Sequence, residues 1–232
     1  MPSPTAEPVT IAVGDAHRVS GLFLLPSVPT ACIVLAHGAG AGMKHPFMAA
    51  VSADLLPLNI ATLRYQFPYM ERRSKRVDPP ALCHSTVRAA VAEAARLAPG
   101  LPLYAAGKSF GGRMASQAQA ASPLPGVRGL VFFGFPLHPP GKPSDERGKH
   151  LLEVQIPMLF LQGTKDEFAA QHLLQPLVGS LGSRATLRIF AEADHSFHVP
   201  ARSGRKDADV RSELLRETVA WIESVNGSSS TR

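Results

Sequence analysis

Strand-length apolar runs alternate with longer amphipathic segments along this chain, and this alternation constrains its fold more than any other feature. The segments that we predict to be buried strands are 31–37, 60–67, 101–107, 127–135, 156–163 and 185–193. The segments that we predict to be helical are 46–58, 80–98, 109–121, 166–181 and 207–225. Near-continuous hydrophobic strands between helices are typical of a parallel sheet that helices cover on both faces. We therefore expect an α/β fold with a mostly parallel central sheet.

The 232-residue sequence contains no internal repeat and no low-complexity linker, which predicts a single domain over residues 1–225. A chain of this length buries enough surface to fold without a disulfide or a metal ion. Two earlier apolar runs, 9–13 and 21–25, flank a turn-like segment and predict an N-terminal hairpin at one edge of the sheet. We expect the final residues 226–232, which read NGSSSTR, to form a disordered polar tail.

The net charge of +6 raises the question of nucleic-acid binding. Most of the excess lies in two short stretches, ERRSKR at 71–76 and ARSGRK at 201–206. Neither zinc-finger spacing nor an RNP-type aromatic motif accompanies them, and aromatic residues make up only 6% of the sequence. We therefore assign both stretches to solvated loops and do not expect nucleic-acid binding to be the main function.

Cysteine usage and the N-terminal sequence bear on the compartment. Cys32 and Cys83 are isolated and show no CxxC spacing, so we expect reduced, structural thiols of the kind found in the cytoplasm. The first ten residues lack the basic and apolar regions of a secretory signal. No apolar run approaches the roughly 18 residues that a membrane-spanning helix requires. We predict a cytoplasmic protein without a membrane partner.

The stretch YAAGKSFGGRMAS at 104–116 places a serine between a predicted strand and a predicted helix. Gly107 and Gly111 lie two residues before and two residues after Ser109, where small residues relieve the crowding of a very tight turn. This pattern, G-x-S-x-G, is that of a nucleophile elbow. The alternatives are a phosphate-binding glycine turn and a helix capped by Ser109. The upstream glycine of a Walker motif is missing at the required spacing, which disfavours phosphate binding.

A serine nucleophile requires a base and an acid that orients the base, which follow the serine in the order acid, then histidine, in this kind of sheet. Asp166 comes just past the predicted strand 156–163, and His195 comes just past 185–193. Three strand ends thus supply Ser109, Asp166 and His195 in the required order, and we predict that they form a catalytic triad.

Neighbouring residues compete for two of these roles. Glu167 adjoins the predicted acid, but the residue directly past GTK is better placed. Asp194 precedes the predicted base in sequence, so its side chain should diverge from the imidazole. His198 lies three residues beyond the base, and we assign it to the loop.

Hydrolysis of an ester by this machinery also requires two backbone donors for the developing oxyanion. The N–H of Phe110, directly after the serine, is the first candidate. The segment VLAHGAGAGMKHPF at 34–47 supplies the second, which we assign to Ala39, with Gly38 and Gly40 shaping the loop. We expect His37 to brace this loop through hydrogen bonds rather than to act in catalysis.

The motifs LAHGAGAGM, GKSFGGRMAS, LQGTKDEF and ADHSFHVP resemble those of α/β hydrolases along nearly the whole chain. Two more distinctive segments, RYQFPYMERRSKRVDPP and GFPLHPPGKPSDERGKHL, are similar to the KANL/Tex-type α/β-hydrolase-like branch, near the dienelactone-hydrolase-like enzymes. The resemblance implies the α/β-hydrolase fold and a serine-hydrolase triad at Ser109, Asp166 and His195. It implies no particular substrate.

The interval 136–155, where many such proteins insert a helical cap, is rich in proline and charge and has room for one small helix. We expect no cap domain and an open site. Phe135, Leu137 and His138 are candidates for the substrate rim, and Tyr69, after another strand end, is a fourth. The alternative for the proline-rich segment is a rigid surface loop.

These observations predict a serine hydrolase that acts on small carboxylic esters or thioesters. Clusters of histidine, cysteine and aspartate with ligand spacing are missing from the sequence, so we expect no metal ion and no organic cofactor. The alternative is a protein-interaction module with the hydrolase fold, an unused triad, and the basic loops as its contact surface for a protein partner.

Overall fold

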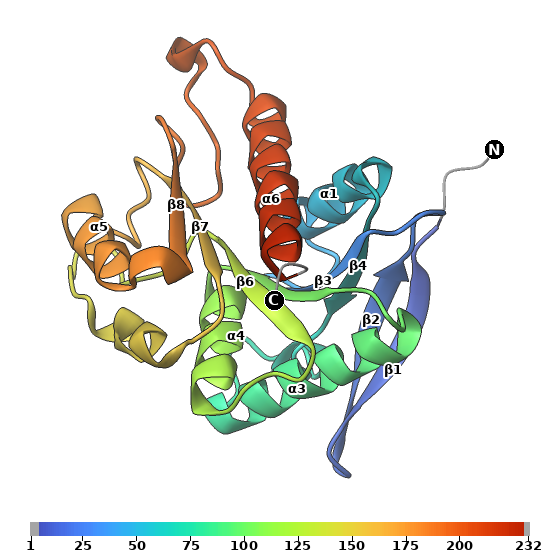
Figure 1. The fold of residues 1–232 in the computed structure, drawn as a ribbon. Helices are drawn as coiled ribbons and strands as arrows, with labels where there is room; N and C mark the ends of the chain where they lie inside the picture. The colour runs from blue at the N-terminus through green and yellow to red at the C-terminus, as the bar shows by residue number, and fades with distance from the viewer. Residues whose placement is uncertain (1–4, 230–232) are drawn as a thin grey trace.

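The computed structural model describes residues 5–229, which form one eight-stranded sheet (Figure 1). The strands are β1 (Glu7–Val13), β2 (His17–Leu24), β3 (Ala31–Ala36), β4 (Ile60–Tyr65), β5 (Leu103–Lys108), β6 (Val127–Phe133), β7 (Met158–Gly163) and β8 (Ala185–Phe190). Their order across the sheet is β1-β2-β4-β3-β5-β6-β7-β8. The β1–β2 hairpin is antiparallel and joins β4 antiparallel, while all pairs from β4 to β8 are parallel. The predicted mostly parallel α/β sheet is confirmed.

Helices cover both faces of this sheet (Figure 1). Helices α1 (Pro46–Leu55) and α6 (Asp207–Ser229) pack on one face, and α3 (Pro80–Leu97), α4 (Phe110–Ala121) and α5 (Gln171–Ser180) pack on the other. The remaining helices are short: η1 (Leu56–Leu58), α2 (Pro68–Glu71), η2 (Glu146–Glu153), η3 (Gly182–Arg184) and η4 (Ala201–Ser203). None of the described helices is long and apolar enough to cross a membrane.

Strand β3 shows why the sequence of a central strand is continuously hydrophobic. Successive side chains of a strand point to opposite faces of the sheet. Ile33 and Leu35 pack in the core beneath α1 and α6, whereas Val34 and Ala36 pack in the core beneath α3 and α4. Both faces are therefore buried, and neither tolerates the polar alternation of a half-exposed strand.

The chain reverses its direction of winding at β3. It passes from β3 through α1 to β4 on one side, and then crosses back so that β5 pairs with the other side of β3. Ala36 is in register with Gly107, so β3 and β5 end at the same level of the sheet. Such a switch point opens a crevice at the carboxyl ends of the strands, where ligands bind in open α/β sheets.

The interval between β6 and β7 contains one short helix, η2, which lies against α4. Within residues 134–157 no further helix or strand is present. The prediction that the domain has no cap is confirmed.

Two predicted boundaries are wrong. Helix α5 begins at Gln171 rather than at residue 166, because the Phe168 N–H donates to Asp166 Oδ1 (2.8 Å) and the Ala170 N–H donates to His138 Nε2 (2.8 Å). These bonds hold residues 166–170 in a turn.

The second wrong boundary is the start of the predicted disordered tail at residue 226. Helix α6 continues to Ser229, so residues 226–229 are helical. Tyr104 Oη donates to Asn226 Oδ1 (2.8 Å) and so fastens the end of the helix to β5. Of the predicted tail, residues 230–232 lie outside the described residues.

Candidate active site

Ser109 lies between β5 and α4 in a backbone conformation that residues other than glycine rarely adopt, with φ of 50° and ψ of −115°. The turn is tight because α4 starts almost in contact with the sheet. A Cβ atom on Gly107 would lie 2.1 Å from the backbone N of Gly112. A Cβ atom on Gly111 would lie 2.6 Å from the carbonyl oxygens of Ala36 and His37. Both flanking positions therefore require glycine, as the sequence pattern predicts.

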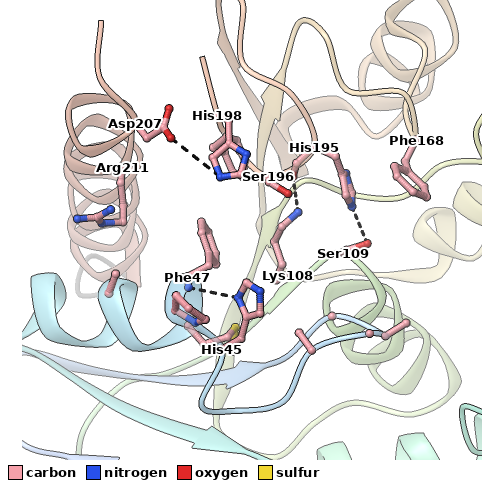
Figure 2. Close-up of a pocket in the computed structure, with 18 residues that line it drawn as sticks. His45, Phe47, Lys108, Ser109, Phe168, His195, Ser196, His198, Asp207 and Arg211 are labelled. Atoms are coloured by element: carbon pink, nitrogen blue, oxygen red, sulfur yellow. Dashed lines mark hydrogen bonds and ion pairs between the residues drawn. The ribbon is translucent and has the colours of Figure 1, made fainter. Parts of the chain in front are cut away.

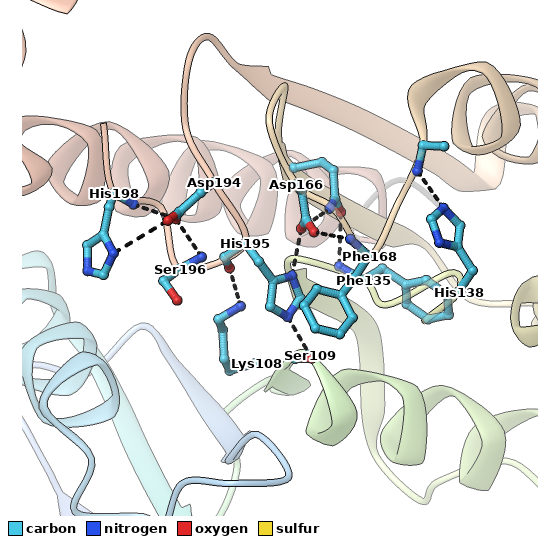
Figure 3. Close-up of polar contacts among 12 residues, drawn as sticks. Lys108, Ser109, Phe135, His138, Asp166, Phe168, Asp194, His195, Ser196 and His198 are labelled. Carbon is cyan, nitrogen blue, oxygen red and sulfur yellow. Dashed lines mark hydrogen bonds and ion pairs between the residues drawn. The ribbon is translucent and has the colours of Figure 1, made fainter. Parts of the chain in front are cut away.

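A chain of hydrogen bonds leads from Ser109 to the ends of β7 and β8 (Figure 3). His195 Nδ1 lies 2.7 Å from Asp166 Oδ2, and His195 Nε2 lies 2.8 Å from Ser109 Oγ. A carboxylate only accepts hydrogen bonds, so the ring carries its proton on Nδ1 and leaves Nε2 to accept from the serine hydroxyl. The structure thus brings the three predicted triad residues together in the order required for proton transfer.

The Asp166 carboxylate is held in place by partners that the sequence analysis missed. Its side chain is fully buried. Gln162 Nε2 donates to Oδ2, and the backbone N–H of Phe168 donates to Oδ1. Gln162 Oε1 in turn accepts from the Phe135 N–H (2.9 Å). The signal was present in the sequence, since Gln162 is the polar residue in the otherwise apolar strand β7.

The competing residues take part in the loops rather than in this chain of hydrogen bonds. Asp194 Oδ1 accepts from the backbone N–H groups of Ser196 (2.8 Å) and His198 (2.9 Å), which shapes the loop that carries the imidazole (Figure 3). The His198 side chain is 66% exposed and lies 3.6 Å from Asp194. Glu167 is exposed.

His37 is buried and organises the loop after β3. Its Nδ1–H donates to Gly38 O (2.8 Å), and its Nε2 accepts from the Phe67 N–H (3.1 Å). The same Gly38 carbonyl accepts from the Ala41 N–H (3.1 Å). In a planar trans peptide the N–H points opposite to the carbonyl. The orientation of the Gly38 carbonyl therefore fixes the direction of the Ala39 N–H.

The predicted substrate rim is wrong. Tyr69, Phe135, Leu137 and His138 are all buried, and none of them lines the cavity beside Ser109. Tyr69 instead donates from Oη to Ala39 O (2.9 Å) and so holds the loop after β3 from within.

Phe135, Leu137 and His138 are buried because the segment after β6 runs beneath the turn at 166–170. The His138 N–H donates to Phe168 O (2.9 Å), and its ring accepts from the Ala170 N–H. The proline-rich residues that follow, 140–143, are exposed, as in the alternative that we considered for this segment.

A cavity of about 660 Å³ opens beside Ser109 and extends toward α1 and α6 (Figure 2). Its walls come from the loop after β3, the start of α1, the loop after β8 and the start of α6. The apolar wall includes Phe47, Phe168 and Phe197. The polar lining residues are His45, Lys108, Ser109, His195, Ser196, His198, Asp207 and Arg211. Within residues 5–229 no group of three or more histidine, cysteine or acidic side chains is arranged to hold a metal ion.

Lys108, which the sequence analysis did not single out, precedes the serine and places its ammonium group in this cavity (Figure 2). Its Nζ donates to the backbone carbonyl of His195 and lies 6.0 Å and 5.6 Å from the ring centroids of Phe47 and Phe197. Burial lowers the pKa of Lys108 to about 8. The sequence signal that could have identified Lys108 was its position inside the elbow motif, directly before Ser109.

The sequence matches the alpha/beta hydrolase domain over residues 29–223. The chain belongs to the α/β hydrolase family. Several solved structures share the fold of this hydrolase. A dienelactone hydrolase from Anabaena variabilis ATCC 29413 has a TM-score of 0.76 at 20% identity, with 96% of this chain and 98% of that chain covered.

Two further structures are described as serine hydrolases. An α/β serine hydrolase without a lid from Xanthomonas campestris has a TM-score of 0.74 at 22% identity, covering 94% of this hydrolase and 95% of that chain. An alpha-beta serine hydrolase homologue from Coxiella burnetii has a TM-score of 0.74 at 20% identity, covering 92% of this hydrolase and 97% of that chain. The predicted superfamily is confirmed, and these likenesses establish the fold.

The packing of the elbow predicts the effect of adding a single methyl group. Gly107→Ala should lower the free energy of unfolding by about 3 kcal/mol or more, because the new Cβ would collide with backbone that cannot move independently. Gly179→Ala in α5 is the matched control, since a Cβ there meets nothing within 4 Å. It should leave stability unchanged or raise it by up to about 1 kcal/mol. Urea denaturation followed by circular dichroism measures both, and equal stability of the two variants would contradict the packing described.

The buried His37 predicts a loss of stability in mild acid. Burial lowers its pKa to about 4, and the hydrogen bond to Gly38 offsets this only in part. Between pH 6.5 and 4 the unfolded chain therefore binds a proton that the folded chain does not. Stability should fall across this window as the pH is lowered, by about 3 kcal/mol from His37. His150 contributes in the same window, since burial and then the charges of Arg113 and His84 lower its pKa to about 4.

The variant His37→Asn should therefore show a shallower decline of unfolding free energy between pH 7 and 5 than the unaltered protein. His172→Asn, at an exposed position on α5, is the control and should keep the full slope. Urea denaturation at a series of pH values measures the slopes. An unchanged slope in His37→Asn would show that His37 is not a buried neutral imidazole.

Proposed function

We propose that this α/β hydrolase is a serine hydrolase that cleaves small carboxylic esters or thioesters. The observation that carries the proposal is the continuous hydrogen-bond chain from Ser109 through His195 to Asp166, with its serine end in the cavity. A nucleophile, a base in contact with it and a carboxylate that orients the base are the parts required for acyl transfer.

In the first half of the reaction, Ser109 Oγ attacks the carbonyl carbon while its proton passes to His195 Nε2. The Asp166 carboxylate keeps the Nδ1 proton in place and stabilises the imidazolium that forms. When the tetrahedral intermediate collapses, His195 gives its proton to the leaving alkoxide or thiolate. The alcohol or thiol departs, and the acyl group stays on the serine.

In the second half, a water molecule replaces the alcohol. His195 Nε2 takes a proton from this water as its oxygen attacks the acyl carbon. Collapse of the second intermediate breaks the bond to Ser109 Oγ, which recovers its proton from His195. The products are a carboxylic acid and the original enzyme.

The N–H groups of Phe110 and Ala39 are the proposed donors to the oxyanion. Phe110 is the first residue of α4, where backbone N–H groups lack partners within the helix and the helix dipole favours negative charge. Gly38 lies against the nucleophile, since a Cβ on it would be 4.0 Å from Ser109 Cβ. The Ala39 N–H follows directly, and His37 fixes its peptide plane. Donors that are oriented before the reaction stabilise the developing charge without reorganisation.

This function predicts which serine reacts. A fluorophosphonate probe should label the native protein at Ser109, and kcat/KM for a short p-nitrophenyl ester should fall about 10³-fold or more in Ser109→Ala and in His195→Ala. Ser85→Ala on α3 and His172→Ala on α5 change exposed residues of the same types and should keep full activity. Labelling measured by mass spectrometry and turnover measured by absorbance provide the two readouts.

A folded native protein that neither reacts with the probe nor hydrolyses p-nitrophenyl esters of any chain length would contradict the proposal. That result would favour the interaction module, in which the triad is unused and the basic loops contact a protein partner.

A further inference from the structure

An ammonium group lies inside the cavity, one residue before the nucleophile and directly against the loop of the base (Figures 2 and 3). The Nζ of Lys108 donates one hydrogen bond to the backbone carbonyl of His195. The rings of Phe47 and Phe197 flank the same nitrogen. An ammonium group has three N–H donors, and in this geometry one of them has an oxygen acceptor, the His195 carbonyl.

Within residues 5–229, Lys108 forms no ion pair with a carboxylate. The two acidic residues whose charges act on it, Asp166 and Asp194, are engaged elsewhere. Asp166 accepts from His195, and Asp194 accepts from two backbone N–H groups of its own loop. A charge that is mostly surrounded by protein and has no counter-ion destabilises the folded state, and a bound anion removes that penalty.

The rest of the cavity fits a short chain that ends in a negative charge. The apolar part of the cavity lining consists largely of small and aromatic side chains, which suit methylene groups. At the far end, Arg211 adds a second cation, whose Nε pairs with Asp54 at 2.7 Å. Asp207 is the carboxylate of the lining, and it lies 4.0 Å from His198.

We infer that the enzyme selects half-esters or half-thioesters of short dicarboxylic acids, with Lys108 binding the free carboxylate of the acyl group. This inference rests on the proposed hydrolase function and names its substrate class. The acyl chain lies between the nucleophile and Lys108, and its carboxylate takes the donors that the His195 carbonyl leaves unused. A charge-assisted hydrogen bond of this kind, removed from bulk water, supports a preference of about tenfold or more over a neutral analogue.

The test compares two substrates that differ only in this charge, p-nitrophenyl hemiglutarate and its neutral methyl ester. The unaltered enzyme should show a kcat/KM about tenfold or more higher for the anionic substrate. Lys108→Met should bring the ratio to one or below, and Lys108→Arg should keep part of the preference. Arg216→Gln, an exposed charge on α6, controls for net charge and should keep the full ratio.

The ratio separates binding of the substrate from support of the loop. If Lys108 serves only to hold the His195 carbonyl, its replacement should lower kcat/KM for both substrates by the same factor. Equal losses, or an unaltered enzyme without preference for the anion, would overturn the inference while leaving ester hydrolysis by Ser109 intact.

A binding measurement makes the inference testable without turnover. Glutarate should bind to Ser109→Ala in a calorimetric titration, and its affinity should fall about tenfold or more when Lys108→Gln is added. Failure of glutarate to bind would overturn the inference. Failure of the fluorophosphonate probe to react with Ser109, with glutarate still bound through Lys108, would overturn the proposed function alone.

Discussion

The close approach of two backbone segments is the constraint on which the rest of the site depends. Strand β5 and the start of α4 meet so tightly that Gly107 and Gly111 have no room for a side chain. Ser109, between them, is therefore forced into a sparsely populated conformation, and strain of this kind persists only where the surrounding packing determines it. The hydroxyl is presented to the cavity by the fold itself. No flexible loop has to close to expose it.

Hydrogen bonds within the protein hold the acid, the loop of the imidazole and the loop after β3 in place without a substrate. Gln162 and the Phe168 N–H hold the Asp166 carboxylate, and Asp194 shapes the loop that carries His195. His37 fixes the peptide plane between Gly38 and Ala39 in the loop after β3. Such preorganisation matters because a site that is already oriented loses little free energy to reorganisation as charge develops. Lys108 is the exception, since its charge has no carboxylate partner in the described part of the chain.

Features that leave a local pattern, either a hydrophobic periodicity or a short motif, were predictable from the sequence. The central strands, the glycines of the elbow and the three strand ends that supply Ser109, Asp166 and His195 all leave such a pattern. The substrate rim was not predictable, because it depends on which segments pass over or under one another. Tyr69 and His138 follow strand ends as the triad residues do, yet both turn inward to bind backbone groups. Helix α6 extends beyond the end of its apolar pattern because Asn226 accepts a hydrogen bond from Tyr104, which lies on a strand distant in sequence.

The central claim is that Ser109 carries the acyl group between two half-reactions, and direct trapping of that intermediate tests it most closely. The protein is mixed with p-nitrophenyl acetate, quenched in acid within the first turnover and digested for mass spectrometry. The account predicts one acetyl group per chain, on the peptide at Ser109, formed at the same rate as the first equivalent of p-nitrophenol. Acetyl on Lys108 in its place, or turnover with no acetyl on Ser109 at any quench time, would contradict it.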